Sequence, residues 1–413
     1  MTWFSREWGN RESGQASMVT VTMFMMLFAI VSVSFTYIVV STTRQATNDS
    51  LQSTAKAAAE SGVEDAKRLL MYCLNNQNGD GSFNLSGDKL AMCQNVVGRT
   101  IDETGCQDVL KYAGSVGFSV ESDNGNYSVP VGGTDSDSNP EYYQCLKIAT
   151  MTPTYQGIAN TDGESVVVPM KLVDRNGNPA DAAQVEINWH RNIVGEYGDQ
   201  LAMGISSGSS IPRQSVWNSS STNQPAILRV EQVFAPKTGN ITLGTLIAND
   251  SAITLRPSTG GSTSGNITAY HPKYNNTDGN DDQPNDTTTP IVEVRCYNYA
   301  DNHADYACKY TLTGGMATAS NDYFLRINTI YKGTHFLIAA KDASGNPLYF
   351  DGVQPIVDVT GRSADSFARI QAQLQSSVED DAAKWWPEYA IETEGRVCKD
   401  ISVYYDSGSD GCN

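Results

Sequence analysis

One stretch of the sequence has the residue pattern of a catalytic nucleophile. Residues 204–208 read GISSG, which fits the Gly-x-Ser-x-Gly turn that presents a serine in hydrolases, here Ser206. That turn needs a strand before it and a helix after it, whereas SSIPR continues a Ser/Gly-rich tract. The histidines share no metal-ligand spacing and no phosphate loop is present: His190, His271, His303 and His335. We therefore predict that the protein is not an enzyme and needs no cofactor.

Oxygen-rich turns offer the chemistry of calcium binding. Asn76, Asn78 and Asp80 copy the opening of an oxygen-ligand loop, but its twelfth position, Gly87, has no carboxylate. Two other groups are similar: Asp135, Asp137 and Asn139, and Asp278, Asn280, Asp281 and Asp282. Each reads more simply as a solvated turn. We predict no metal site and keep calcium at the first group as the alternative.

Cysteines provide the third kind of chemistry. The chain has 8 of them: Cys73, Cys93, Cys106, Cys145, Cys296, Cys308, Cys398 and Cys412. No Cys-x-x-Cys pair occurs, which argues against zinc, and an even number in an exported domain predicts disulfides. Short spacings favour Cys296 with Cys308 and Cys398 with Cys412. The pairing among the first four stays open.

A long helix near the N-terminus must position the rest of the chain. Residues 18–40 contain no charge, proline or glycine, and about 23 residues make a helix of about 34 Å, enough to span a bilayer. Beyond them an apolar stripe recurs at steps of three and four: Leu51, Thr54, Ala55, Ala58, Gly62, Ala66, Leu69, Leu70 and Cys73. This stripe must pack on a domain of the same chain or on a neighbouring copy of the helix.

Composition limits the class of protein. The 413 residues suffice for one large or two ordinary domains beyond the helix. With 28 basic against 46 acidic side chains, the net charge of -18 argues against nucleic-acid binding and against binding of anionic lipids through the domain. We expect an ectodomain with one membrane segment.

The remaining chain reads as turns and strands. Residues 75–140 form a Cys-containing loop region with a short helix within 88–112, held through Cys93 and Cys106. A first β region, 141–256, and a second, 291–413, flank a polar low-complexity loop, 257–290. Strands are predicted over 142–150, 164–173, 184–190, 226–234, 290–300, 305–312, 322–331, 334–342 and 355–374.

The predicted β regions also contain two tight turns and a C-terminal group of aromatic residues. Gly-Asn-Pro turns occur within 173–182 and 341–350, and Asn176 with Gly177 suits positive φ. Near the C-terminus, Trp385, Trp386 and Tyr389 form either a core cluster or a carbohydrate platform, before a loop closed by Cys398 and Cys412. The predicted fold is α+β, with a long helix followed by a mainly antiparallel β ectodomain.

The N-terminal segment resembles type IV pilins, in particular large minor pilins and pseudopilins. Residues 1–14 form a short polar leader that ends in Gly14, and Gln15 leads directly into the hydrophobic run. Residues 52–70 also resemble the second half of the first pilin helix, and the strands after residue 290 resemble the pilin sheet more loosely. The resemblance implies cleavage between Gly14 and Gln15 by a prepilin peptidase and a helix over 15–74.

The same resemblance implies a function in assembly. The partners would be other pilin subunits and the pilus assembly platform, first in the cytoplasmic membrane with the N-terminus inside and later in an extracellular pilus. Val19 stands at mature position five, where major pilins carry a glutamate, which favours a minor or tip subunit. A surface or host-cell ligand of the ectodomain is a further expectation. The alternative is an adhesin or receptor ectodomain that stays anchored by one span and never enters a filament.

Overall fold

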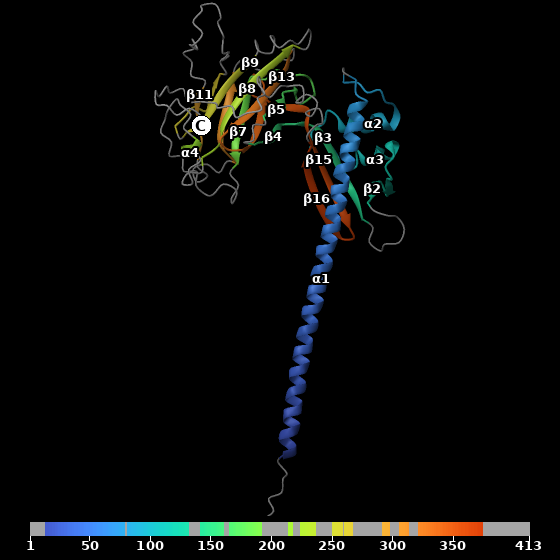
Figure 1. The fold of residues 1–413 in the computed structure, drawn as a ribbon. Helices are drawn as coiled ribbons and strands as arrows, with labels where there is room; N and C mark the ends of the chain where they lie inside the picture. Colours follow the sequence, from blue (N-terminus) through green and yellow to red (C-terminus); the bar gives the residue numbers. More distant parts are fainter. Residues whose placement is uncertain are drawn as a thin grey trace, which may run out of the picture.

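A computed structural model describes the fold over most of the chain (Figure 1). The described residues are 13–78, 81–131, 141–160, 165–191, 214–217, 224–236, 250–258, 260–266, 291–297, 305–313 and 321–374. The structure confirms the α+β class: a long N-terminal apolar helix is followed by a large, mostly antiparallel β domain.

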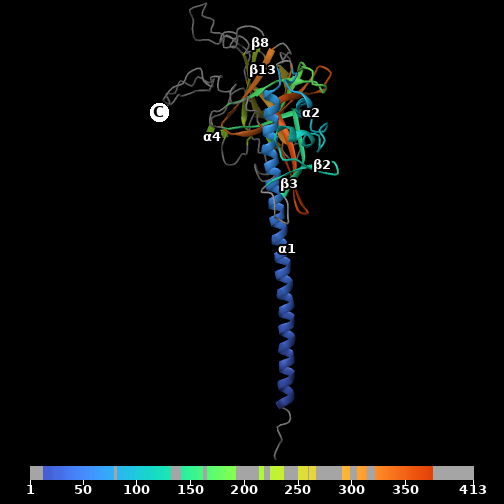
Figure 2. The ribbon, with the colours of Figure 1, turned by 90° about the vertical axis from the view of Figure 1, so that its right-hand side faces the viewer.

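Helix α1 (Ser13–Asn75) is one continuous helix of 63 residues. No proline occurs along it, and no glycine lies between Gln15 and Ser61, so nothing interrupts the hydrogen-bond ladder there. At its C-terminal end, the Asn76 side-chain amide donates to the Tyr72 carbonyl oxygen at 2.8 Å, which satisfies one of the last helical carbonyls. Figures 1 and 2 show the helix as a rod that carries the β domain at this end.

Short elements fill the region that was predicted as a loop. They are α2 (Gly87–Val96), α3 (Leu110–Ala113), the 3-10 helix η1 (Gly114–Val116), β1 (Glu121–Asp123) and β2 (Asn126–Pro130). A single short helix was expected there, and the structure has two α-helices instead. The β1–β2 hairpin turns at Asn124, whose φ of 49 is left-handed, a conformation that Asn tolerates.

The other elements are strands and one short helix. They are β3 (Glu141–Thr152), β4 (Thr154–Ala159), β5 (Val166–Pro169), β6 (Leu172–Val173), β7 (Gln184–Arg191), α4 (Gln214–Trp217), β8 (Ile227–Pro236), β9 (Asp250–Ser258), β10 (Ser264–Asn266), β11 (Ile291–Arg295), β12 (Tyr306–Thr313), β13 (Asn321–Ile330), β14 (Thr334–Lys341), β15 (Pro347–Ser363) and β16 (Ser366–Gln373).

The described strands form two sheets. An 11-stranded sheet has the order β1-β2-β3-β15-β14-β7-β12-β10, with β16 and β6 paired to β15 and β4 paired to β14. A 5-stranded sheet has the order β11-β9-β8-β13-β5. The pairs β10–β12 and β11–β9 are parallel, and the other strand pairs are antiparallel.

Two hydrophobic cores result, and β15 contributes to both. Leu348 and Phe350, near its start, lie in a core between the two sheets. Val357 and Val359, further along the strand, lie in a second core under α1, α2 and α3. The strand accommodates this change through a bulge between Asp351 and Ile356. One strand therefore couples the sandwich to the helix-covered part of the sheet.

Several predicted boundaries differ from the structure. The two predicted β regions interleave, because β8 pairs with β13 and β3 pairs with β15. The strand predicted over 164–173 is divided between the two sheets, since β5 ends at Pro169, which has no N–H to donate to a ladder. The strand predicted over 355–374 is a hairpin of β15 and β16. The predicted loop over 257–290 begins with the end of β9 and contains β10.

The two Gly-Asn-Pro turns share one hydrogen-bond pattern. Asp174 Oδ1 accepts from the Asn176 and Asn178 amides at 2.8 and 2.9 Å, and Asp342 Oδ1 accepts from the Ser344 and Asn346 amides at 2.9 and 2.8 Å. The Asn178 and Asn346 side chains also donate to Asp174 Oδ2 and Asp342 Oδ2, at 3.0 and 2.9 Å, and these bonds together with the backbone bonds lower the pKa of both carboxyl groups. The glycine of each turn takes a positive φ, 81 in the first and 84 in the second, whereas the positive φ expected at Asn176 is not observed.

Candidate functional site

The N-terminal part of α1 is the largest exposed apolar surface among the described residues. Its large side chains between Met18 and Val40 are all exposed, up to 76% for Tyr37. It is the one helix of the described chain that is long and apolar enough to cross a membrane. Exposed apolar surfaces of this size mark sites of contact with a membrane or with another protein.

Several hydroxyl groups in this segment and just after it donate to the backbone of the helix itself. Thr22, Ser34 and Thr36 donate to carbonyl oxygens three or four residues earlier at 2.8–3.1 Å, and Thr42 and Thr43 do the same. Polar groups in an apolar environment are costly unless they are hydrogen-bonded. The segment therefore remains compatible with lipid or with a neighbouring helix despite its Ser and Thr content.

From Ala55 onward, α1 is clamped by the β domain. Ala55, Ala58, Ala59 and Ala66 have no exposed surface. A Cβ atom at Gly62 would lie 2.5 Å from Val359 Cγ1, and one at Gly361 of β15 would lie 2.5 Å from the Ala59 backbone nitrogen. Small residues on both sides thus let the helix lie directly on the strand. The apolar stripe packs on the chain's own domain from Ala55 to Cys73.

A buried polar contact holds the helix to β3. The Tyr143 hydroxyl donates to Asp65 Oδ2 at 2.9 Å, and the Tyr143 side chain is 1% exposed. Burial, together with the nearby Asp65 carboxylate, raises the pKa of Tyr143 far above its usual value, so the phenol stays protonated and donating.

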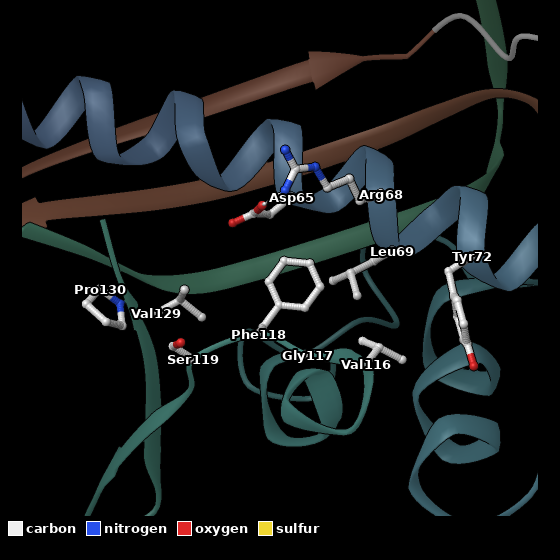
Figure 3. A pocket seen from close by; sticks show the side chains of 10 residues that line it. All are labelled: Asp65, Arg68, Leu69, Tyr72, Val116, Gly117, Phe118, Ser119, Val129 and Pro130. Carbon is white, nitrogen blue, oxygen red and sulfur yellow. Dashed lines mark ion pairs between the residues drawn. The ribbon is translucent and has the colours of Figure 1, made fainter. Parts of the chain in front are cut away.

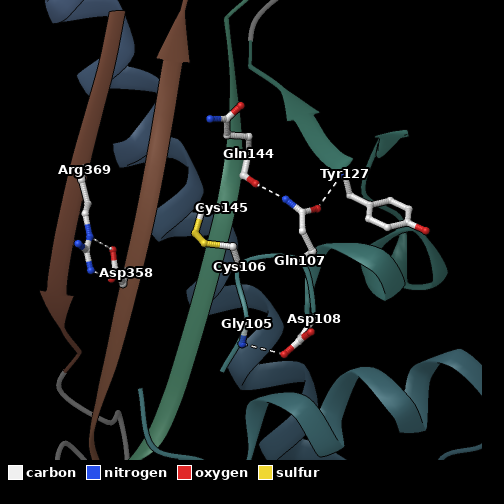
Figure 4. Close-up of a disulfide and its surroundings, with 9 residues drawn as sticks. All are labelled: Gly105, Cys106, Gln107, Asp108, Tyr127, Gln144, Cys145, Asp358 and Arg369. Carbon is white, nitrogen blue, oxygen red and sulfur yellow. Dashed lines mark hydrogen bonds and ion pairs between the residues drawn. A yellow bond between two sulfur atoms is a disulfide. The ribbon is translucent and has the colours of Figure 1, made fainter. Parts of the chain in front are cut away.

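Two disulfides stabilise the region around α1, one between two helices and one between the loop after α2 and the sheet. Cys73 at the end of α1 is bonded to Cys93 of α2, and Cys106 is bonded to Cys145 of β3. Figure 4 shows Gln107 beside the second bond, where its side chain donates to the Gln144 carbonyl and accepts from the Tyr127 amide, both at 2.6 Å. In the sandwich, Cys296 is bonded to Cys308. Cys398 and Cys412 lie outside the described residues.

A pocket of about 470 Å³ lies on one flank of the clamped helix. Figure 3 shows Asp65 and Arg68 of α1 on one wall and Phe118 facing them from the segment after η1. Arg68 Nη1 is 3.7 Å from Asp65 Oδ1, and the rest of the lining is mostly apolar. The lining contains no nucleophile paired with a base, which acid–base catalysis would need. The pocket is therefore better suited to binding an apolar side chain than to catalysis.

The structure places some of the predicted site residues and leaves others outside. Gly14 and Gln15 lie in the first turn of α1, and Val19 is 66% exposed. The Asn78 side-chain nitrogen donates to Ser82 Oγ at 2.8 Å. The predicted residues that lie outside the described ranges are Asp80, Ser206, His271, His303, Trp385, Trp386, Tyr389 and the two Asp/Asn groups at 135–139 and 278–282.

His190 and His335 are described but do not form a metal site. Within the described ranges, no group of three or more His, Cys, Asp or Glu side chains is placed to hold an ion. His190 is 3% exposed, and burial, aided by Lys332, lowers its pKa to about 4. A neutral, buried histidine of this kind is a structural residue.

Comparisons with known proteins add no assignment. No family model matches the chain, and no curated protein or solved structure matches it significantly.

Residues that clamp the helix were not identified from the sequence. Gly361 and Tyr143 lie in strands whose sequence predicts only that they are extended, and Asp65 is one of many charged residues on a long helix. Their partners are distant in sequence, since 78 positions separate Tyr143 from Asp65. No local sequence pattern therefore indicates the contact.

Proposed function

We propose that this protein is a minor subunit of a type IV pilus-like filament, with the filament tip as its expected place. It would assemble through α1 and display the β domain on the outside of the cell. The observation that supports this proposal best is the division of α1 into an exposed apolar half and a clamped half.

The physical step is a change of neighbours for the exposed half. Lipid surrounds residues 18–40 before assembly, and like helices of other pilin subunits surround them afterwards, so the apolar side chains stay out of water throughout. The clamped half keeps the β domain outside the helix bundle. The expected orientation has the N-terminus inside, and the pilus assembly platform would draw the helix out of the membrane.

Val19 supports a position at the tip of the filament. A filament subunit inserted between others needs a partner for the N-terminal amine of its neighbour at membrane depth, and Val19 supplies no charge. A subunit at the tip needs no such pairing with a subunit above it.

N-terminal sequencing of the mature protein tests the proposal. We expect the chain to start at Gln15 and to co-purify with sheared filaments. A Gly14→Asp variant should retain Met1 and stay in the membrane fraction, whereas the matched Gly9→Asp variant should be processed normally. A mature chain that keeps Met1 and never enters filaments would instead favour a permanently anchored adhesin or receptor ectodomain.

Adhesion through the polar loop is a secondary part of the proposal. Because β9 and β10 occupy residues 250–258 and 264–266, a clean deletion must begin after Asn266 and end before β11 starts at Ile291. Removing residues 267–290 should reduce attachment of cells to a surface while leaving filament assembly intact. Unchanged attachment would exclude the loop as the adhesive segment.

A further inference from the structure

Three side chains on two neighbouring strands converge on the face of the large sheet. Lys309 of β12 is the direct register partner of Asn188 of β7. Glu186 precedes Asn188 by two residues on the same strand, so its side chain lies on the same face. Side chains of directly opposed residues in an antiparallel pair are close enough to touch. Lys309, Asn188 and Glu186 therefore lie together on one face of the sheet.

The Glu186 carboxylate contacts both nitrogen atoms. Glu186 Oε2 lies 2.7 Å from Lys309 Nζ, and Glu186 Oε1 accepts from Asn188 Nδ2 at 3.1 Å. Asn188 is 9% exposed, and the Glu186 side chain is 20% exposed. One carboxylate thus holds an amine by one oxygen and an amide nitrogen by the other.

We propose that Lys309 and Asn188 form an intramolecular amide bond, with Glu186 transferring the proton. This modification would link β7 and β12 covalently. It does not depend on the proposed function, since a filament subunit and a permanently anchored ectodomain would both carry it.

The atoms of the step balance without a co-reactant. The Lys309 ammonium gives one proton to Glu186, and the free amine attacks Asn188 Cγ, forming the new C–N bond. The Cγ–Nδ2 bond then breaks, and the departing nitrogen takes a proton from Glu186 and a second from the attacking nitrogen. The nitrogen therefore leaves as ammonium, and Glu186 returns to its ionised form. No group is oxidised or reduced.

Two features of the triad favour this reaction. The reacting groups are held together by the sheet, and such intramolecular arrangement replaces a bimolecular encounter, with effective molarities on the order of 10⁵ M or more when alignment is good. Burial would raise the pKa of Glu186, but the hydrogen bonds from Lys309 and Asn188 lower it, so the carboxylate is ionised and holds the Lys309 amine beside Asn188.

The exposure of Lys309 sets the conditions for the reaction. Its side chain is 53% exposed, so water stabilises the ammonium form. Only the neutral amine attacks, so the rate of bond formation must rise as the solution becomes more alkaline. The bond should accumulate with time after folding, faster at pH 9 than at pH 7.

Mass spectrometry of the full-length chain in detergent tests the proposal. After incubation at pH 9, the intact mass should fall by about 17 Da, the mass of ammonia, and a proteolytic peptide should contain both residue 188 and residue 309. Cyclisation of an N-terminal glutamine loses the same mass, so only the linked peptide shows that the amide bond between Lys309 and Asn188 has formed. Absence of that peptide after prolonged incubation at pH 9 would overturn the proposal.

Variants separate the chemistry from the ion pair. Lys309→Arg keeps the charge beside Glu186 but has no nucleophilic amine, so the linked peptide should disappear while the thermal midpoint at pH 7 before incubation stays unchanged. Glu186→Gln should slow formation at least tenfold, because the proton acceptor is lost. Lys341→Arg, a matched change on the neighbouring strand β14, should have no effect. Full-rate linkage in Glu186→Gln would refute the assigned role of Glu186.

Discussion

At the scale of single residues, the absence of a side chain at two glycines sets the distance between α1 and the sheet. The space that a Cβ would need at Gly361 is occupied by the backbone of Ala55 and Ala59, and backbone atoms of a helix cannot turn aside as a flexible side chain can. Gly62 is limited by Val359, which is a side chain. Gly361 of β15 therefore tolerates an added side chain less well than Gly62 of α1 does.

Gly361→Ala should lower the free energy of unfolding by about 1–3 kcal/mol, the usual cost of overpacking a tight contact. Denaturant titration of the full-length chain in detergent, followed by far-UV circular dichroism, measures this change. Gly260→Ala is a suitable control, since a Cβ there meets nothing within 4 Å. Equal stability of the two variants would contradict the close approach.

His190 predicts how stability depends on pH. Its pKa is lowered to about 4 in the folded chain, so the unfolded chain, with a histidine pKa of about 6.5, binds more protons between these values. This contribution to stability is complete above pH 6.5 and is lost as the pH falls toward 4, by up to about 3 kcal/mol. The φ of His190 is 62, which Asn tolerates, so His190→Asn removes the titration without adding backbone strain.

The measurement for this prediction is a series of unfolding titrations from pH 7.5 to pH 4. The loss of stability over that interval should be smaller in His190→Asn than in the unchanged chain. The pH 7.5 value of each protein is its own reference. Parallel curves would show that acid sensitivity arises elsewhere.

At the scale of elements, the end of α1 is fixed by a covalent bond as well as by packing. The Cys73–Cys93 disulfide closes a loop with a sequence separation of 20, and loss of such a bond costs about 2–5 kcal/mol in small exported domains. Replacing both cysteines by serine should therefore loosen the last turns of the helix. Cleavage by trypsin at Lys67 and Arg68, which lie in those turns, should become faster.

The matched control removes the disulfide of the sandwich instead. Cys296→Ser with Cys308→Ser opens a bond with a separation of 12, in the core that does not include α1. Both double variants should melt at a lower temperature, but only the first should make Lys67 and Arg68 more accessible to trypsin. Equal cleavage in both would mean that the domain unfolds as one unit.

Local periodicity predicted those elements whose burial follows one face of the chain. The stripe from Ala55 to Cys73 predicted the clamped half of α1, and alternation predicted β16, where Ala368 and Ile370 are half-buried and Phe367 and Arg369 are exposed. The turn before β16 could not be predicted, because Ala364 takes a φ of 49 without the help of glycine or asparagine.

The order of strands in the sheets depends on contacts that are distant in sequence. Gln354, for example, exchanges two hydrogen bonds with Gln156, a separation of 198 residues. No local pattern encodes such a pairing, so the interleaving of the two predicted β regions appears only in the structure. The same holds for the clamp at Gly361 and Asp65, and for the Lys309–Glu186–Asn188 triad.

At the scale of the whole molecule, a polar stretch of helix separates the apolar span from the β domain. Residues 41–50 are exposed on all sides and make about 15 Å of helix at 1.5 Å per residue. Figures 1 and 2 show that the β domain lies beyond this stretch in both views. A permanent anchor would use the stretch only as a spacer in water, whereas a filament subunit would bury it between neighbouring helices.

Adding charge to this stretch distinguishes the two roles. Ala46→Glu with Thr47→Glu leaves the apolar span untouched, and acidic residues have little influence on membrane orientation, so membrane fractionation should not change. Incorporation into sheared filaments should fall on the order of tenfold or more, because a charge buried without a partner is costly. The same two charges placed on the exposed face of β16, by Gln371→Glu with Gln373→Glu, should leave incorporation intact. If the helix variant enters filaments as well as this control does, residues 41–50 are not buried by neighbours, and assembly must depend on the apolar span alone.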